Sequence, residues 1–184
     1  MGQDRRRAAG DSRNGHMGSD PSTSAPFSIA GLRPRVAIAK DIRTSGEVLA
    51  RMATSADITV RQTVAANPST PAEDLQRLAQ DQNWAVRRGV THNPDVEPGL
   101  LASLAQDPEL LIRVNVARHP KTSADLLAVL ARDHNYAVRR AVIANSKVTP
   151  ELLVMLVRDP DPRIGQLAAG HPLCPAHIRA LSRI

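Results

Sequence analysis

Aromatic residues are almost missing from this chain of 184 residues, which has one Phe, one Trp and one Tyr. A core must therefore be filled by Ala, Val, Leu and Ile, which suits thin helical layers better than a β-sandwich. A single cysteine, Cys174, excludes an internal disulfide framework and a cluster held by several thiolates. Apolar runs such as Leu152–Val157 are far shorter than the about 20 residues of a membrane helix, so we expect no membrane contact.

Cations exceed anions, with 24 Lys and Arg against 18 Asp and Glu and a net charge of +6. Residues 1–30 combine the run Arg5–Arg7 with Gly, Ser, Asp and Pro and show no apolar periodicity. This composition predicts a disordered tail. It has no apolar segment of the secretory kind, so we expect a cytoplasmic protein.

A 26-residue period begins at residue 34. An apolar residue followed by Arg recurs at 60–61, 86–87, 112–113 and 138–139. Each unit then carries Asn or His, in most copies followed by Pro, next a pair of leucines, and finally an Asp. The period predicts repeats at about 34–59, 60–85, 86–111, 112–137, 138–163 and 164–184, and a repeat domain over 31–184.

Each unit reads as two short helices. Val86 and Val90 share one helical stripe, Pro94 ends that helix, and Pro98 opens a second one. Asp107 is expected to cap the helix that follows. Because neither helix can bury its apolar face alone, the copies are predicted to stack into an all-α, right-handed superhelical solenoid of about five to six repeats.

This pattern of Val-Arg, Asn-Pro, Pro, Leu-x-x-Leu and Asp resembles the bacterial leucine-rich repeat variant family. The resemblance implies alternating short helices, one of which can tighten to a 3₁₀ form, and implies no defined activity. The six-residue spacing from Asp81 to Arg87 is also similar to HEAT-type repeats, where such residues form a ladder between neighbours. Some family members carry an iron–sulfur cluster on a cysteine-rich N-terminal segment. This chain has no cysteine there, so we expect no cofactor.

The recurring Arg admits two interpretations. Arg87 projects to the flank of its helix, where the Asp of the neighbouring repeat is expected, and Arg113 and Arg139 follow the same geometry. We favour an ion-pair ladder between repeats over a direct role in binding anions.

Five further residues are candidates for a binding surface. Trp84 with Arg88, and Tyr136 with Arg140, lie four residues apart and are expected to point away from the core. Arg118 is a further cation outside the repeat pattern. A two-unit duplication with a local cation–π contact is the favoured explanation, and a shared ligand surface is the alternative.

A metal site could be imagined at His171, Cys174 and His177. However, His171 occupies the position that Asn67, Asn93 and Asn145 hold in other copies, so we expect a helix-ending residue and no metal.

The leading hypothesis is a non-enzymatic interaction scaffold that binds a protein partner through an extended solenoid face. The alternative is nucleic-acid backbone binding by an Arg-rich face, since phosphate contacts need clustered cations. An apolar last helix, with Ile178 and Leu181, predicts a monomer or a weak end-to-end dimer. No catalytic arrangement stands out from the repeat.

Overall fold

The computed structural model describes residues 29–181, and every element in that range is an α-helix. Six helices form the first halves of the repeats: α1 (Ile29–Lys40), α3 (Ile58–Ala66), α5 (Trp84–Val90), α7 (Leu110–Arg118), α9 (Tyr136–Ile143) and α11 (Pro162–Gly170). Six form the second halves: α2 (Gly46–Met52), α4 (Ala72–Leu78), α6 (Pro98–Leu104), α8 (Ala124–Leu130), α10 (Pro150–Val157) and α12 (Ala176–Leu181). The predicted all-α repeat solenoid is confirmed, with both helices of each described repeat in the α form rather than the 3₁₀ form.

The helices keep the 26-residue phase along the whole described range. Every even-numbered helix starts 26 residues after the previous one, from Gly46 to Ala176, and the odd-numbered helices do the same from Ile58 to Pro162. The first helix, α1, begins at Ile29, two residues before the predicted start of the repeat domain. The rest of the predicted tail, 1–28, lies outside the described residues.

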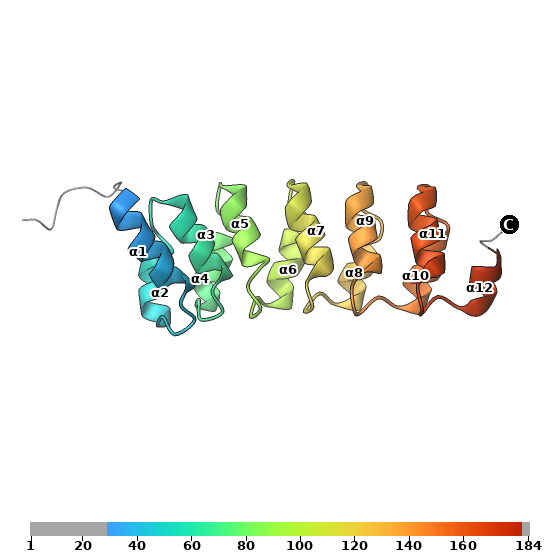
Figure 1. Cartoon of the computed structure of the whole chain (residues 1–184), viewed down its shortest axis with the longest axis horizontal. Helices are drawn as coiled ribbons and strands as arrows, with labels where there is room; N and C mark the ends of the chain where they lie inside the picture. The colour runs from blue at the N-terminus through green and yellow to red at the C-terminus, as the bar shows by residue number, and fades with distance from the viewer. Residues whose placement is uncertain (1–28, 182–184) are drawn as a thin grey trace, which may run out of the picture.

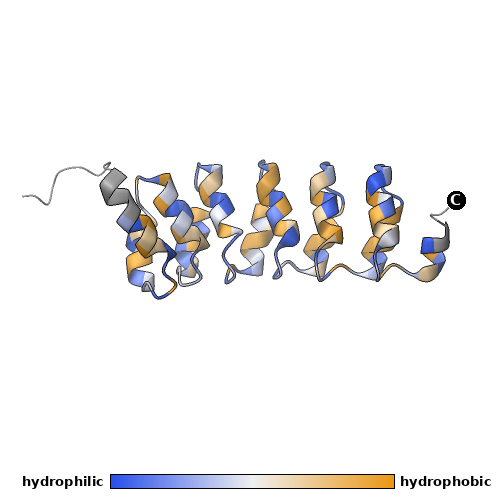
Figure 2. Cartoon of the chain, viewed as in Figure 1, coloured by the Kyte–Doolittle hydropathy of each residue, from blue (hydrophilic) through white to orange (hydrophobic). Residues whose placement is uncertain are grey.

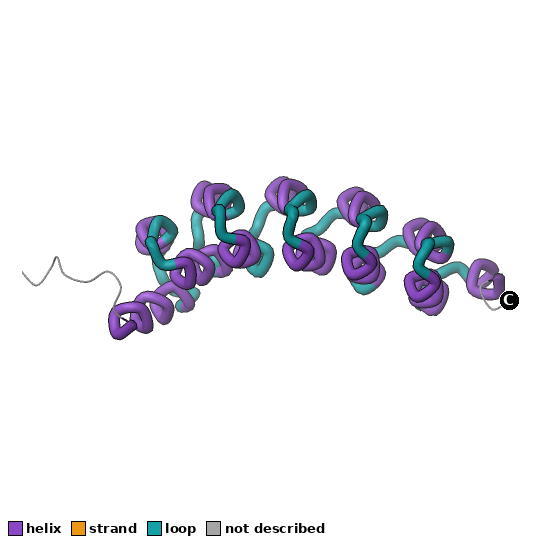
Figure 3. Tube along the Cα trace, turned by 90° about the horizontal axis from the view of Figure 1, so that it is seen from above, coloured by secondary structure: helices purple, strands orange, loops and turns teal. Residues whose placement is uncertain are grey.

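The twelve helices form two layers that curve into an arc (Figures 1 and 3). The odd-numbered helices stand side by side on the inner, concave side of the arc, and the even-numbered helices form the outer layer. Neighbouring odd-numbered helices pack directly on each other, whereas the even-numbered helices pack mainly on odd-numbered ones. Closer spacing within the odd-numbered layer is what makes that layer the inner side of the curve.

A thin aliphatic core lies between the two layers. Each odd-numbered helix after α1 contributes two buried residues four positions apart, such as Val86 and Val90, and each even-numbered helix from α4 to α10 contributes Leu at equivalent positions, such as Leu101 and Leu104. These apolar residues recur in every helix pair beside polar positions (Figure 2). The predicted stripe is therefore the buried one.

The helix starts differ from the prediction in one detail. The N-caps of the odd-numbered helices include Asn83 and Asn135, whose side chains accept hydrogen bonds from the first-turn N–H groups of Ala85 and Ala137. The expected cap, Asp107, is wrong: it lies two residues before the actual N-cap and accepts from the N–H of Glu109 instead. The carboxylate shapes the turn ahead of the helix, and both of its oxygens also accept hydrogen bonds from Arg87 on the preceding odd-numbered helix.

A second polar row holds the opposite ends of the odd-numbered helices together. The side chain of Asn93 is fully buried and donates to the carbonyls of Ala65, at 3.1 Å, and Asn67, at 2.6 Å, both in the preceding repeat. Asn67 and Asn145 make the same pair of contacts one repeat earlier and two repeats later, and His119 contacts the carbonyl of Asn93. We call these four residues the asparagine ladder, although its third member is His119. It satisfies carbonyls that the helix ends leave without partners.

One glycine marks the closest helix approach. A Cβ placed on Gly89 of α5 would lie 2.5 Å from the carbonyl oxygen of Gln62 in α3 and 2.9 Å from the Cβ of Ala65. Only a residue without a side chain therefore allows α5 to pack this tightly on α3.

Candidate functional site

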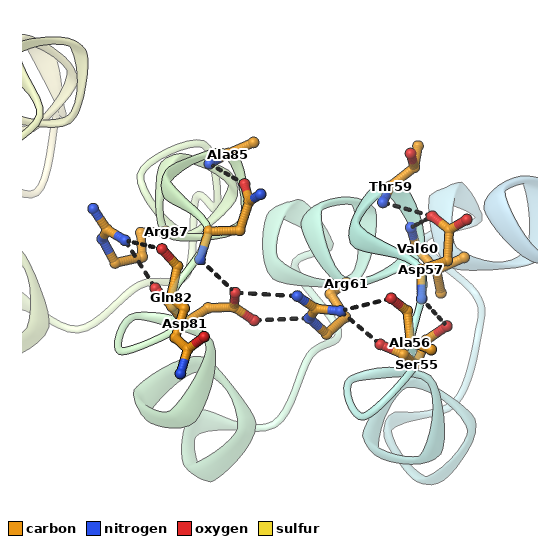
Figure 4. A network of polar contacts seen from close by, with 11 residues as sticks. Ser55, Ala56, Asp57, Thr59, Val60, Arg61, Asp81, Gln82, Ala85 and Arg87 are labelled. Carbon is orange, nitrogen blue, oxygen red and sulfur yellow. Dashed lines mark hydrogen bonds and ion pairs between the residues drawn. The ribbon is translucent and has the colours of Figure 1, made fainter.

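The recurring Arg residues form the predicted ion-pair ladder, in which each Arg of an odd-numbered helix pairs with the Asp in the turn before the next odd-numbered helix (Figure 4). Arg61, Arg87, Arg113 and Arg139 pair with Asp81, Asp107, Asp133 and Asp159, each through two guanidinium nitrogens. Each guanidinium also donates to two backbone carbonyls in the turn before its own helix, as Arg87 does to those of Asp81 and Gln82. Their hydrogen bonds are therefore used inside the fold, and these four cations are not the anion-binding row that the sequence left as an alternative.

The ladder fixes the ionised state of three of its carboxylates. Burial of Asp81 opposes ionisation, but hydrogen bonds from Arg61 and from the N–H of Asn83 outweigh burial and lower the pKa of the carboxyl. The pKa values of Asp133 and Asp159 are lowered by the same balance of burial and Arg hydrogen bonds. These groups stay charged and paired at neutral pH.

None of the six odd-numbered helices contains an Asp or a Glu. The even-numbered helices carry several, including Glu47, Glu73 and Asp125. Carboxylates approach the odd-numbered layer at its helix ends, for example at the N-cap Asp161, which pairs with Arg163. The concave side is therefore lined by helices that contribute cations and no anions.

The centre of the concave side is a row of residues two positions after the first buried residue of each odd-numbered helix from α3 to α11. A step of 100° per residue places this position opposite the core stripe. We call these five residues the central row: Gln62, Arg88, Val114, Arg140 and Gln166, of which Val114 is buried. Two of the predicted site residues, Arg88 and Arg140, thus occupy equivalent places two repeats apart.

Arg118 lies on the same side of the layer. It is the last residue of α7, exposed, and four positions beyond Val114, so it shares the face of the central row. No carboxylate in the described part of the chain pairs with Arg88, Arg118 or Arg140. The structure thus brings the three predicted cations onto one concave face.

The aromatic residues are placed differently from the favoured prediction. No cation–π contact within residues 34–179 joins Trp84 to Arg88 or Tyr136 to Arg140; instead the guanidinium of Arg163, from the next repeat, lies 4.4 Å from the ring centroid of Tyr136. Trp84 is 41% exposed, whereas Tyr136 is half-buried and packs against the core.

The repeat position of Trp84 and Tyr136 is occupied by apolar residues in the other repeats as well. It holds Ile58, Leu110 and Pro162, so Trp84 and Tyr136 belong to the repeat pattern. The alignment at 26-residue spacing could have shown this, and it leaves the free guanidiniums as the stronger site signal.

Two hollows open on the concave side, each beside one Arg and one Gln of the central row. The N-terminal hollow, about 520 Å³, is lined by residues of α1, α3 and α5 that include Lys40, Gln62, Arg88 and His92. The C-terminal hollow, about 570 Å³, is lined by residues of α9, α11 and the loops after them. Arg140 and Gln166 lie on its wall, together with the apolar side chain of Leu167.

Arg88 has an unusual environment in the N-terminal hollow. Its Nε atom is buried and has no hydrogen-bond partner, while the backbone carbonyl of the same residue contacts Nδ1 of His92 at 2.8 Å. Because a buried donor without a partner is costly, most such donors in proteins are paired. The side chain of Arg88 is therefore held by packing and not by polar contacts.

Sequence reasoning missed some residues of this face. Leu111, on α7, is 50% exposed, and Lys40 and His92 line the N-terminal hollow. These residues follow neither the repeat pattern nor an Arg-aromatic motif. Only the identification of the odd-numbered layer as the concave one singles them out.

His171 and Cys174, two of the residues considered for a metal site, have structural positions instead. His171 is the C-cap of α11, and its Nδ1 accepts from the N–H of Leu173, which is the helix-ending role expected for it. Cys174 is buried. Over residues 29–181, no group of three or more His, Cys, Asp or Glu side chains could hold a metal ion. Within the same range, no helix is both long and apolar enough to cross a membrane.

The fold and this face define the class of protein, a helical repeat scaffold. Residues 59–113 match the model of the Leucine Rich Repeat Variant domain. The match supports the predicted resemblance to the leucine-rich repeat variant family over these residues. Repeat scaffolds of this family suggest a role in protein interaction in general.

Among solved structures, the chain is similar to one described as "a leucine-rich repeat variant with a novel repetitive protein structural motif". The identity is 27% and the TM-score 0.39, over 74% of this chain and 64% of that one, so the match spans less than two thirds of the solved chain. A comparison with curated proteins gave no match.

Proposed function

We propose that this chain is a non-enzymatic interaction scaffold that binds a protein partner along its concave face. The observation that carries the proposal is the division of labour among its cations. Four Arg residues are paired with Asp in the ion-pair ladder. Arg88, Arg118 and Arg140 share one face and have no carboxylate partner in the described part of the chain. Exposed apolar residues, Trp84 and Leu111, lie in the same helical layer. Arg and aromatic residues are enriched where binding energy concentrates in protein interfaces.

Affinity capture with a matched charge control tests the proposal. The variant Arg88→Gln/Arg118→Gln/Arg140→Gln removes the three concave cations. The control, Arg51→Gln/Arg132→Gln/Arg158→Gln, removes three exposed cations associated with the outer layer and has the same net charge. We expect the concave variant to lose the proteins captured by the wild type and the control to keep them. If both variants capture the same proteins as the wild type, the concave face is not the binding surface.

Nucleic-acid backbone binding is the second candidate, and the same acid-free helical layer favours it. Phosphate contacts require clustered cations and give binding that falls steeply with salt. Titration of a single-stranded and a double-stranded oligonucleotide at 50 mM and 200 mM salt tests this function. Absence of binding at the lower salt concentration would eliminate it.

The oligomeric state and location complete the proposal: a cytoplasmic monomer, or a weak dimer formed end to end. Sedimentation over a range of protein concentrations separates the two states. A single monomeric species at the highest concentration would dismiss the dimer.

A further inference from the structure

The central row is symmetric about Val114. Going outward in both directions, the residues are Arg and then Gln, so that each hollow receives one Arg and one Gln. Arg presents a planar fork of donors that matches a carboxylate, and Gln can both donate to and accept from a peptide group. The row is thus a series of hydrogen-bonding side chains interrupted by one apolar residue at its middle.

We propose that the concave face binds an extended acidic segment of its partner protein, with two carboxylates six residues apart seated on Arg88 and Arg140. This inference rests on the proposed function and specifies the chemistry of the partner. The segment carries apolar side chains between its carboxylates, and these contact the exposed Leu111.

The spacing follows from the repeat geometry. Packed helices lie about 8 to 10 Å apart, so two repeats separate Arg88 from Arg140 by about 16 to 20 Å. An extended chain advances about 3.3 Å per residue, so five to six residues cover that distance. Side chains alternate in direction along an extended chain, and only an even separation puts both carboxylates on the same side. Six residues is the separation that satisfies both conditions.

Charge complementarity selects an acidic occupant. The three free guanidiniums belong to helices without a single Asp or Glu, and Lys40 adds a fourth cation at the N-terminal hollow. The packing that holds Arg88 without a polar partner for its Nε also places the guanidinium on the wall of the hollow. An incoming carboxylate therefore meets a cation whose position is already set, which lowers the entropic cost of binding.

The mixture of side chains favours a protein segment over a nucleic-acid backbone. Val114 separates the two Arg of the central row, and the exposed Leu111 lies on the same helix. A phosphate backbone carries one charge per nucleotide and gains from a continuous row of cations. An acidic peptide can instead match two separated guanidiniums and cover the exposed Leu111 on the helix between them.

Two labelled peptides of equal composition test the spacing by fluorescence anisotropy. Both are 15 residues long with two Glu in a Ser, Gly and Leu background; one has the Glu pair six residues apart and the other three residues apart. We expect the first peptide to bind the full chain about five times more tightly, which corresponds to one partly exposed guanidinium–carboxylate pair of about 1 kcal/mol. Arg88→Gln and Arg140→Gln should each abolish the difference, while Arg132→Gln and Arg158→Gln should preserve it.

Three results would overturn the inference: equal binding of the two peptides, no binding of either, or a preference that survives Arg88→Gln and Arg140→Gln. A 15-nucleotide oligothymidine that binds more tightly than both peptides, and that loses binding in the same two variants, would overturn it in favour of nucleic acid. If the peptide test fails but affinity capture still depends on Arg88, Arg118 and Arg140, the six-residue spacing is rejected and the proposed function stands. If affinity capture is unchanged when those Arg residues are replaced, the proposed function itself is rejected.

Discussion

Replacing Asn93 with Ala tests the role of the asparagine ladder in holding repeats together. The side chain is fully buried and takes part in three hydrogen bonds: two donated to the carbonyls of Ala65 and Asn67, and one accepted from the N–H of Asp95 at 2.8 Å. Each buried group left without a partner costs about 1 to 3 kcal/mol, and relaxation recovers part of that cost. We therefore expect Asn93→Ala to lower the free energy of unfolding by about 2 to 4 kcal/mol.

Urea denaturation of the variant and of a matched control measures this loss. Asn115→Ala is the control, because its partly buried side chain makes one hydrogen bond, to Oγ1 of Thr91 at 3.0 Å, and should cost about 0.5 to 1.5 kcal/mol. Asn93→Asp keeps the shape and the acceptor but cannot donate, so it should cost at least as much as Asn93→Ala. A loss in Asn93→Ala no larger than that in Asn115→Ala would refute the role assigned to the ladder.

Three further changes probe the other features of the stack. Since the pKa of Asp133 is lowered in the folded state, its contribution to the free energy of unfolding should be complete above about pH 5 and decline as the pH falls below about 4. In urea denaturation, Asp133→Asn should therefore lose less stability than the wild type as the pH falls. An equal loss in both proteins would contradict the ion pair with Arg113. Burial lowers the pKa of His119, so the unfolded chain takes up a proton first as the pH falls below about 6.5 and stability drops; His119→Asn, the residue other repeats use, should remove the dependence between pH 7 and 5, whereas its persistence would point to another group. Gly89→Ala should cost about 1 to 3 kcal/mol in the same melts because its Cβ meets the carbonyl of Gln62, and a neutral result would mean that α5 can move away from α3 freely.

The repeat period gave most of the fold in advance because stacking repeats the same physical demands in every copy. A buried Val stripe, an Arg that pairs with the next Asp and a proline between helices each recur at 26 residues, so a local pattern defines a global structure. The role of Asp107 was misread because an acidic residue near a helix start serves equally as an N-cap or in the preceding turn. Sequence spacing alone does not separate these two geometries.

The candidate site was predicted less completely, because it depends on which layer faces the inside of the arc. Arg88, Arg118 and Arg140 were identified as cations beyond the repeat pattern, but nothing in their spacing states that their helices are the concave ones. Curvature arises from the unequal separation of the two layers, to which small residues such as Gly89 contribute through packing. The contact of Arg163 with Tyr136 was unforeseen for a similar reason, since it joins two repeats and not two turns of one helix.

The ladders and the central row differ in how much the stacking of repeats constrains them. At the ladder position, Arg recurs from Arg61 to Arg139 because the turn before the next odd-numbered helix presents an Asp that must be paired. At the central row, Gln, Arg and Val occupy equivalent places, so the stack does not require one residue type there. The choice of Arg at positions 88 and 140 therefore needs a cause outside the stack, and a carboxylate on a bound partner is the cause that the charge and geometry of this face supply.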